Sequence, residues 1–166
     1  MKLTLPQQDI YFEQLLYPDE PVYNIGAKIS IRGSISYEWL NQAYITLINQ
    51  HDAYRSIISR RGNEVEIDFI ENHGSVLEYV DFSGNTNADE AANEFMQNRF
   101  RVAFDLHSGK LLHQFILVKV GEGFHYLFSV YHHIITDGWG TSLMFQRLVQ
   151  NYNEIARSGT VTTEYN

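Results

Sequence analysis

The sequence predicts an α/β protein, a two-layer sandwich of helices packed on a mixed, largely antiparallel sheet. Segments with helical periodicity alternate with segments of strand periodicity. Two pairs of predicted strands are separated only by short turns, which is typical of hairpins. The chain has 166 residues, of which 44% are hydrophobic, so it can bury one core. We therefore expect a single layered domain.

The first third of the chain predicts a helix, a strand and a second helix. Residues 4–18 begin with Thr4 and Gln7 at capping-box spacing, and the proline at their end should stop the helix. Residues 23–33 alternate apolar and polar side chains, as a half-buried strand does. Residues 36–51 carry one apolar face at helical spacing, formed by Leu40, Ala43, Tyr44, Leu47 and Ile48.

The remainder predicts hairpins and two more helices. Residues 54–71 read as a hairpin that turns at "RGNE", and residues 76–82 as a short strand. Residues 87–104 are helical, with Asn87 and Glu90 as a second capping box. Two long apolar strands flank "GEG" within residues 110–133, and the final helix covers residues 141–156, with its apolar face formed by Met144, Leu148, Tyr152 and Ile155.

Composition argues against several classes of function. The formal net charge is −8, and no run of Lys or Arg is long enough to follow a phosphate backbone, so we expect no nucleic-acid partner. The chain has no cysteine, which excludes disulfides and thiolate chemistry. It also lacks a signal-peptide pattern and any apolar stretch near the ~20 residues that span a bilayer. We expect a cytoplasmic protein with no membrane partner.

Two adjacent histidines end the last predicted strand, within "YHHIITDGWG" of residues 131–140. Side chains alternate across a strand, so His132 and His133 cannot face the same site if the strand stays extended. We predict one structural imidazole and one working imidazole, and periodicity alone does not assign them. The alternative, in which both rings only make hydrogen bonds at a strand end, stays open at this stage.

Asp137 and Gly138 follow the histidines, just before the last predicted helix. Asp137 is placed to cap that helix, and Gly138 would let the chain bend tightly into it. An imidazole able to act as a general base would then lie beside a helix N-terminus, which stabilises developing negative charge. Acyl transfer needs both groups. A metal site is disfavoured, because adjacent histidines chelate poorly and no HExxH or paired-cysteine set completes one.

The stretch "HHIITDGW" of residues 132–139 resembles the HHxxxDG motif of condensation domains of nonribosomal peptide synthetases. Three further stretches resemble segments of that family in the same order: "LTLPQQDIYF" of residues 3–12, "NQHDAYRSII" of residues 49–58 and "FDLHSGKLL" of residues 104–112. The chain departs from the family pattern at Gln50, Tyr54, Ser56 and Lys110.

The resemblance implies the N-terminal lobe of a chloramphenicol-acetyltransferase-like fold over residues 1–157. Residues 158–166 carry no periodic apolar pattern, so we expect a disordered tail there. A complete condensation domain would add a C-terminal lobe. By position, His133 matches the histidine that the family uses at its reaction centre, and His132 matches the structural histidine.

The resemblance also implies roles around these two histidines. Asp137 matches a motif aspartate that pairs with an arginine, and Arg55 matches that arginine. From the residues alone, Arg55 would be a solvated side chain at a strand start. Trp139 would either line a substrate tunnel or pack against the start of the helix, and we favour packing.

The implied reaction is amide formation between a donor acyl or peptidyl thioester and an acceptor aminoacyl thioester. Each substrate would be carried on the phosphopantetheine arm of a donor or acceptor peptidyl carrier protein, so no cofactor is expected on the lobe itself. Expected partners also include the C-terminal lobe and neighbouring synthetase domains, and the isolated lobe should be inactive. The alternatives are a non-catalytic carrier-protein docking module and a stand-alone acyltransferase that uses coenzyme A.

Overall fold

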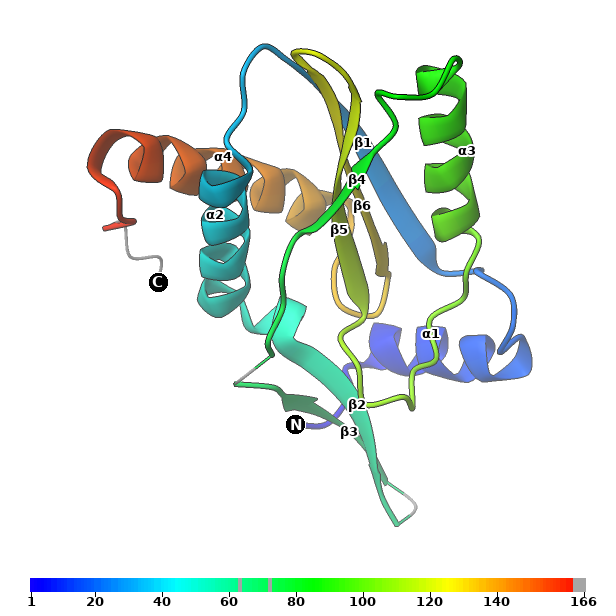
Figure 1. The fold of residues 1–166 in the computed structure, drawn as a ribbon. Coiled ribbons are helices and arrows are strands. Elements are labelled where there is room, and N and C mark those ends of the chain that lie inside the picture. The colour runs from blue at the N-terminus through cyan, green and yellow to red at the C-terminus, as the bar shows by residue number, and fades with distance from the viewer. Residues whose placement is uncertain (63, 72, 163–166) are drawn as a thin grey trace.

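A computed structural model describes residues 1–62, 64–71 and 73–162 of the chain (Figure 1). The elements follow one another largely as the patterns predict. In chain order they are α1 (Leu5–Leu16), β1 (Asn24–Arg32), α2 (Tyr37–Gln50), the short 3-10 helix η1 (Asp52–Arg55), β2 (Ser56–Arg61), β3 (Glu64–Phe69), β4 (Glu78–Asp81), α3 (Ala88–Phe100), β5 (His113–Gly121), β6 (Phe124–His132) and α4 (Gly138–Ser158).

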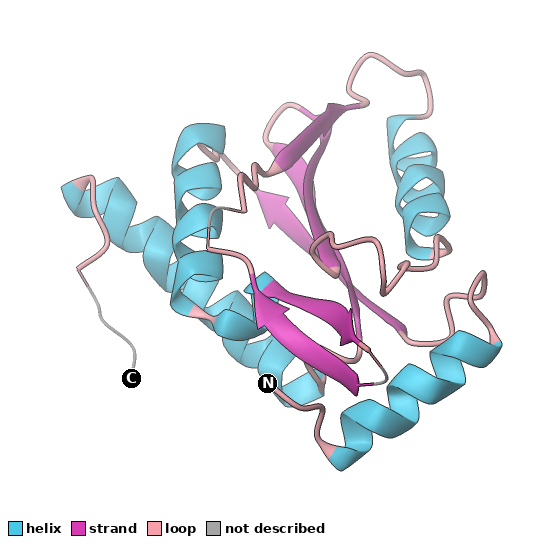
Figure 2. Cartoon of the chain, turned by 90° about the horizontal axis from the view of Figure 1, so that it is seen from below, coloured by secondary structure: helices cyan, strands magenta, loops and turns pink. Residues whose placement is uncertain are grey.

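The central sheet has four strands in the order β1-β6-β5-β4. Strand β6 runs antiparallel to both β1 and β5, while β4 runs parallel to β5. The predicted class, an α/β fold with a mixed and mostly antiparallel sheet, is therefore confirmed. The first predicted hairpin also forms, but β2 and β3 make a separate two-stranded sheet, and Asn63 of its turn lies outside the described residues (Figure 2).

Helices cover both faces of the central sheet, so α3 adds a layer beyond the predicted two (Figure 1). The alternation of side chains along β5 and β6 explains this arrangement, because both strands are apolar on both faces. One face packs against α2 and α4 through Phe115, Leu117, Leu127 and Tyr131. The other packs against α3 through Ile116, Val118, Phe128 and Val130.

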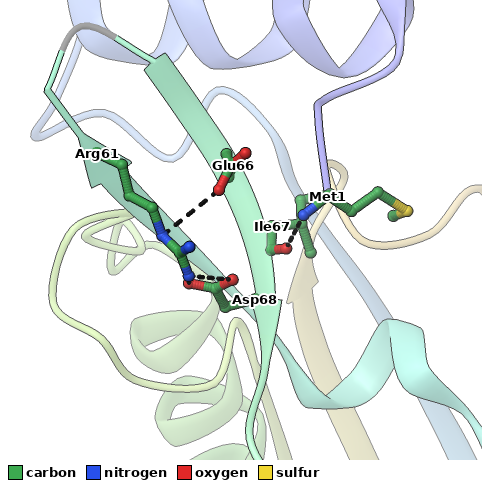
Figure 3. A network of polar contacts seen from close by, with 5 residues as sticks. All are labelled: Met1, Arg61, Glu66, Ile67 and Asp68. Carbon is green, nitrogen blue, oxygen red and sulfur yellow. Dashed lines mark hydrogen bonds and ion pairs between the residues drawn. The ribbon is translucent and has the colours of Figure 1, made fainter.

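A third apolar cluster ties α1 to the hairpin and to the loop after β6. Its buried members are Leu3, Tyr11, Ile58, Ile67, Leu106, Leu112 and Ile134. The N-terminus lies along β3, where the Met1 ammonium group donates to the Ile67 carbonyl at 2.8 Å (Figure 3). The neighbouring Arg61 lies 3.5 Å from Glu66 and 3.3 Å from Asp68 (Figure 3). The apolar cluster and the Met1 contact connect the N-terminal segment to the hairpin, while the Arg61 ion pairs lie within the hairpin itself.

The helix ends test the predicted caps. The Thr4–Gln7 capping box forms as predicted. The second predicted box is wrong, because the Asn87 amide donates to the Glu90 carboxylate at 3.2 Å and Asn87 makes no side-chain cap to the helix backbone. An amide N–H beside a carboxylate satisfies that charge directly, which removes Asn87 from the capping geometry.

The last helix is longer than its apolar pattern, because it starts at Gly138 and ends at Ser158. Of the stretch predicted as a tail, Val161 packs against the core and the Thr162 amide donates to Glu154 at 2.9 Å. Residues 163–166 lie outside the described residues.

Candidate functional site

His133 is the first residue beyond β6 and occupies a turn that leads to α4. Its amide donates to the Tyr23 carbonyl at 2.8 Å, and its ring Nδ1 lies 2.8 Å from the Thr136 carbonyl oxygen. A carbonyl oxygen only accepts hydrogen bonds, so Nδ1 carries a proton, and in the neutral ring Nε2 has the lone pair. Nε2 has no hydrogen-bond partner among the described residues. The ring is therefore oriented by the loop and leaves a basic nitrogen available.

His132 has the opposite environment, because its side chain is 0% exposed. Its Nε2 lies 3.1 Å from Oε1 of Gln14, and its Nδ1 accepts from the Ile134 amide at 3.2 Å. Burial, assisted by the neighbouring His133, lowers the pKa of His132 to about 4, so the ring is neutral near pH 7. A buried ring with both nitrogens occupied cannot meet a substrate, so of the two imidazoles only that of His133 is available to one.

Asp137 is the N-cap of α4, as the sequence predicts. Its carboxylate accepts from the Gly140 amide at 2.8 Å, and its carbonyl accepts from the Thr141 hydroxyl at 2.8 Å. These bonds join the end of the turn to the first turn of the helix. The helix N-terminus is thereby brought to the same loop that carries His133.

The sequence predicts that Gly138 is needed where the turn after β6 meets α4, but the structure requires a glycine at position 140 instead. Gly138 has no positive φ, and a Cβ placed there would meet no atom within 4 Å. At Gly140, in contrast, a Cβ would lie 2.1 Å from Oγ1 of Thr136. Thr136 is the residue whose carbonyl orients His133. The close approach of the helix to the loop therefore depends on Gly140, and a backbone bend at Gly138 does not explain the corner.

The ion pair expected between Arg55 and Asp137 is not formed. Arg55 pairs instead with Asp52, three residues earlier in η1, and none of the ion pairs among the described residues joins it to Asp137. The physical reason is local, since Asp52 lies within one turn of Arg55 while the Asp137 carboxylate is already used as a cap. The Arg55 side chain is only 18% exposed, so it is not the solvated residue that its sequence position suggested.

Trp139 does not pack against the start of the helix, which corrects the interpretation that the sequence favoured. It lies in the first turn of α4 and is 82% exposed. A large aromatic side chain left in solvent, two residues after the Asp137 cap, is unusual for a helix that otherwise buries its apolar face. Trp139 is thus placed at the surface near the candidate site, where a substrate or a neighbouring domain can reach it.

Sequence reasoning missed the polar residues of α1 that hold the histidine loop. Gln14 is 3% exposed and contacts His132, and the side chain of Gln7 donates to the Ile134 carbonyl at 3.0 Å. The available signal was spacing, since Gln7, Tyr11 and Gln14 lie at i, i+4 and i+7, on one face of the helix. Two glutamines in line with a buried tyrosine indicate polar contacts inside the protein.

Among the described residues no cluster of three or more His, Cys, Asp or Glu has the arrangement of a metal site. Nor does any helix in the described ranges have the length and apolar character needed to cross a membrane.

Fold and site together define a lobe that presents an oriented imidazole beside a helix N-terminus, an arrangement suited to acyl transfer. A comparison with known protein families agrees with the acyltransferase class that this arrangement suggests. The condensation domain family matches residues 1–164, and the chain belongs to that family. The family that the sequence resemblance indicated is therefore confirmed.

Similar proteins are large peptide synthetases. The chain is 26% identical over 166 residues to a protein of the linear gramicidin synthase of Brevibacillus parabrevis, covering 95% of this chain and 3% of that protein. It is 28% identical over 156 residues to a protein of the plipastatin synthase of Bacillus subtilis, covering 93% of this chain and 6% of that protein. The chain thus corresponds to a small part of the length of these multidomain proteins.

Solved condensation domains share the fold. The starter condensation domain of rhizomide synthetase superposes with a TM-score of 0.91 at 26% identity, covering 98% of this chain and 39% of that one. A variant of that domain in complex with C8-CoA and Leu-SNAC gives a TM-score of 0.92 at 25% identity, covering 99% and 37%. The chain matches the N-terminal part of these structures and spans well under half of their length.

Proposed function

We propose that this chain is the reaction-centre lobe of a condensation domain, which forms an amide bond between a donor acyl or peptidyl thioester and an acceptor aminoacyl thioester. The observation that carries the proposal is the state of His133. Its Nδ1–H is engaged by the Thr136 carbonyl at 2.8 Å, so its free Nε2 can receive a hydrogen bond from an amine.

In the proposed reaction, the α-amine nitrogen of the acceptor attacks the carbonyl carbon of the donor thioester. A C–N bond forms, the C–S bond breaks, and the sulfur leaves as a thiolate. The proton that the amine nitrogen releases passes to Nε2 of His133 and then to the thiolate, which leaves a thiol and a neutral ring. The hydrogen bond from the amine to Nε2 also orients the lone pair of the amine nitrogen toward the thioester carbonyl, and this positioning supplies part of the rate enhancement.

The start of α4 supports the same reaction electrostatically. Asp137 occupies the Gly140 amide, while the amides of Gly138 and Trp139 make no hydrogen bond to the described residues. These two donors lie at the positive end of a helix of 21 residues. They are suited to stabilise the oxyanion that develops when the thioester carbonyl is attacked.

Donor and acceptor peptidyl carrier proteins, each with a phosphopantetheine arm, are the proposed partners, together with a C-terminal lobe and neighbouring synthetase domains. In this proposal the C-terminal lobe closes the tunnel, so the lobe described here is inactive by itself. Trp139, which is 82% exposed, would line that tunnel. A second donor class, the acyl thioester of coenzyme A, is favoured by the similarity to a starter domain solved with C8-CoA.

The test uses the complete condensation domain that contains this lobe, supplied with an acyl donor thioester and an aminoacyl carrier protein. We expect the His133→Ala variant to lose about 100-fold or more in turnover, as is typical when a positioned base is removed. His125→Ala is the matched control, because His125 lies near the opposite end of β6 and should retain activity. Unchanged turnover in His133→Ala would contradict the proposal. A complete domain that binds carriers but makes no product would favour a docking module.

The donor class is tested in the same assay. Presenting the same acyl group on a carrier protein and on coenzyme A separates the two sources of the thioester. Product from the coenzyme A thioester alone would identify a coenzyme A-dependent acyltransferase. Product from the carrier-bound thioester alone would support the condensation reaction as proposed.

A further inference from the structure

Helix α1 carries two glutamines, Gln7 and Gln14, whose side chains contact Ile134 and His132. Both glutamines lie outside the HHxxxDG segment, and the proposed function does not use them. The side chain of Gln14 is 3% exposed, which is unfavourable for an amide unless its polar atoms are paired. Its Nε2 donates to the carbonyls of Tyr17 and Glu20, at 2.7 and 3.0 Å. Both carbonyls only accept, so these bonds identify the amide nitrogen without ambiguity.

The orientation of Gln14 and the Ile134 amide together determine which ring nitrogen of His132 carries the proton. Because the nitrogen of Gln14 is turned toward the two carbonyls, its Oε1 is the atom 3.1 Å from Nε2 of His132. An amide oxygen only accepts, so His132 must donate from Nε2. Its Nδ1 then has a lone pair, which accepts the Ile134 amide at 3.2 Å. The opposite tautomer would place two donors against each other on one side and two acceptors on the other.

The same helix also holds the next peptide unit. The Gln7 side chain donates directly to the Ile134 carbonyl at 3.0 Å, while the Ile134 N–H reaches α1 only through the ring of His132. Ile134 is the residue directly after His133 and is 2% exposed. Displacing Ile134 would move His133 and the Thr136 carbonyl that orients its ring.

We propose that Gln14 is a positioning residue, which together with the Ile134 amide holds His132 in its Nε2–H tautomer and through it fixes the turn that orients His133. This role assigns to α1 a contribution to the site that the HHxxxDG segment alone does not contain. It rests on the proposed function only in so far as the aim of His133 matters for turnover. The tautomer of His132 and the geometry of the turn are properties of the lobe itself.

The experiment is nitrogen NMR on the 166-residue chain, in which ring nitrogen shifts report the tautomer of each assigned histidine. In the wild type we expect His132 to be protonated at Nε2 and His133 at Nδ1. The Gln14→Met variant keeps the length and apolar volume of the side chain but removes the acceptor. Because the Ile134 amide still donates to Nδ1, we expect the variant to weaken the preference of His132 for the Nε2–H tautomer and to shift the ring signals of both histidines.

Two further variants separate the contributions. Gln14→Glu keeps an acceptor toward His132 and loses both donations to carbonyls, so it should destabilise the end of α1 while retaining the Nε2–H tautomer. Gln8→Met is the matched control, because Gln8 lies on the same helix and donates only to the Leu3 carbonyl, at 3.0 Å. It should leave the signals of both histidines unchanged.

In the complete condensation domain, Gln14→Met should lower kcat about tenfold with little change in KM, and Gln14→Glu should restore much of that loss. Wild-type His132 protonated at Nδ1, or Gln14→Met spectra with unchanged ring signals for both histidines, would overturn the inference even if Gln14→Met folds poorly in other assays. Two results together would refute the proposed function and leave the positioning role intact. They are unchanged turnover of the complete domain in His133→Ala, and His132 ring signals that change in the Gln14 variants as expected.

Discussion

Acidification should destabilise this protein through two buried histidines, before carboxylates contribute. Burial lowers the pKa of His113 to about 4, although its hydrogen bond to the Tyr54 carbonyl acts in the opposite direction. Burial also lowers the pKa of His132 to about 4. Both groups are neutral in the folded state and charge readily when the chain unfolds, since a free histidine titrates near pH ~6.5.

The sign and the size of the effect follow from proton linkage. Between about pH 6.5 and pH 4 the unfolded state binds protons that the folded state does not, so the free energy of unfolding falls as the pH falls. The slope is about 1.4 kcal/mol per pH unit for each histidine. At about pH 5 each histidine has therefore lowered the free energy of unfolding by about 2 kcal/mol, and the two together by about 4 kcal/mol. The total free energy of unfolding of a typical domain is about 5–15 kcal/mol.

Urea unfolding followed by circular dichroism at about pH 7.5 and pH 5 measures this loss. The His113→Gln variant keeps a donor for the Tyr54 carbonyl but removes one titrating group. Its stability should fall by about 2 kcal/mol less than that of the wild type over the same pH interval. Val118→Ala is the control, because Val118 lies on the other face of β5 in the cluster that packs against α3, and its destabilisation should be the same at both pH values. Equal pH dependence in wild type and His113→Gln would refute the reasoning.

Three further predictions concern the corner at α4 and the open sheet edge. Asp137→Ala should lower the free energy of unfolding by about 0.5–2 kcal/mol, while Asp137→Asn, whose side chain can still cap the helix, should not lower it. If a urea titration shows the same loss of unfolding free energy in both variants, an ion pair with Arg55 is indicated instead. Gly140→Ala should destabilise by about 1–3 kcal/mol through its clash with Thr136, whereas Gly138→Ala should be neutral or stabilising; thermal unfolding that ranks them oppositely would contradict the packing at this corner. Strand β1 has no neighbour on its outer edge among the described residues, and its Ile29 is 37% exposed, so we expect the chain to self-associate through this edge and Ile29→Lys to reduce that association in sedimentation velocity. A wild type that sediments as a monomer, or an Ile29→Lys variant that associates equally, would exclude association through this edge.

Local sequence determined much of the scaffold. The helix and strand patterns, the Thr4–Gln7 capping box and the cap at Asp137 all form as predicted. Such features depend on neighbours a few residues away, so the side-chain period and the cap chemistry suffice to predict them. The alternation of faces along β6 likewise indicated that adjacent histidines would have different environments.

Local pattern failed where two chemically reasonable partners compete. Asn87 has the right spacing for a capping box but donates to Glu90 instead. Arg55 has a matching aspartate by family resemblance and pairs with nearby Asp52. In both cases the choice depends on side-chain geometry over a few ångströms, which spacing in the sequence does not specify.

By itself the sequence predicted that the two imidazoles would have different environments if the strand stayed extended, since strand periodicity separates neighbouring side chains, and it left open whether either ring is available to a substrate. Only the tertiary structure decided which is which. The answer comes from Gln14, which is 118 residues away from His132 in the chain and 3.1 Å away in space. A contact between such distant segments depends on how α1 packs across the sheet, and no local period or cap encodes that packing.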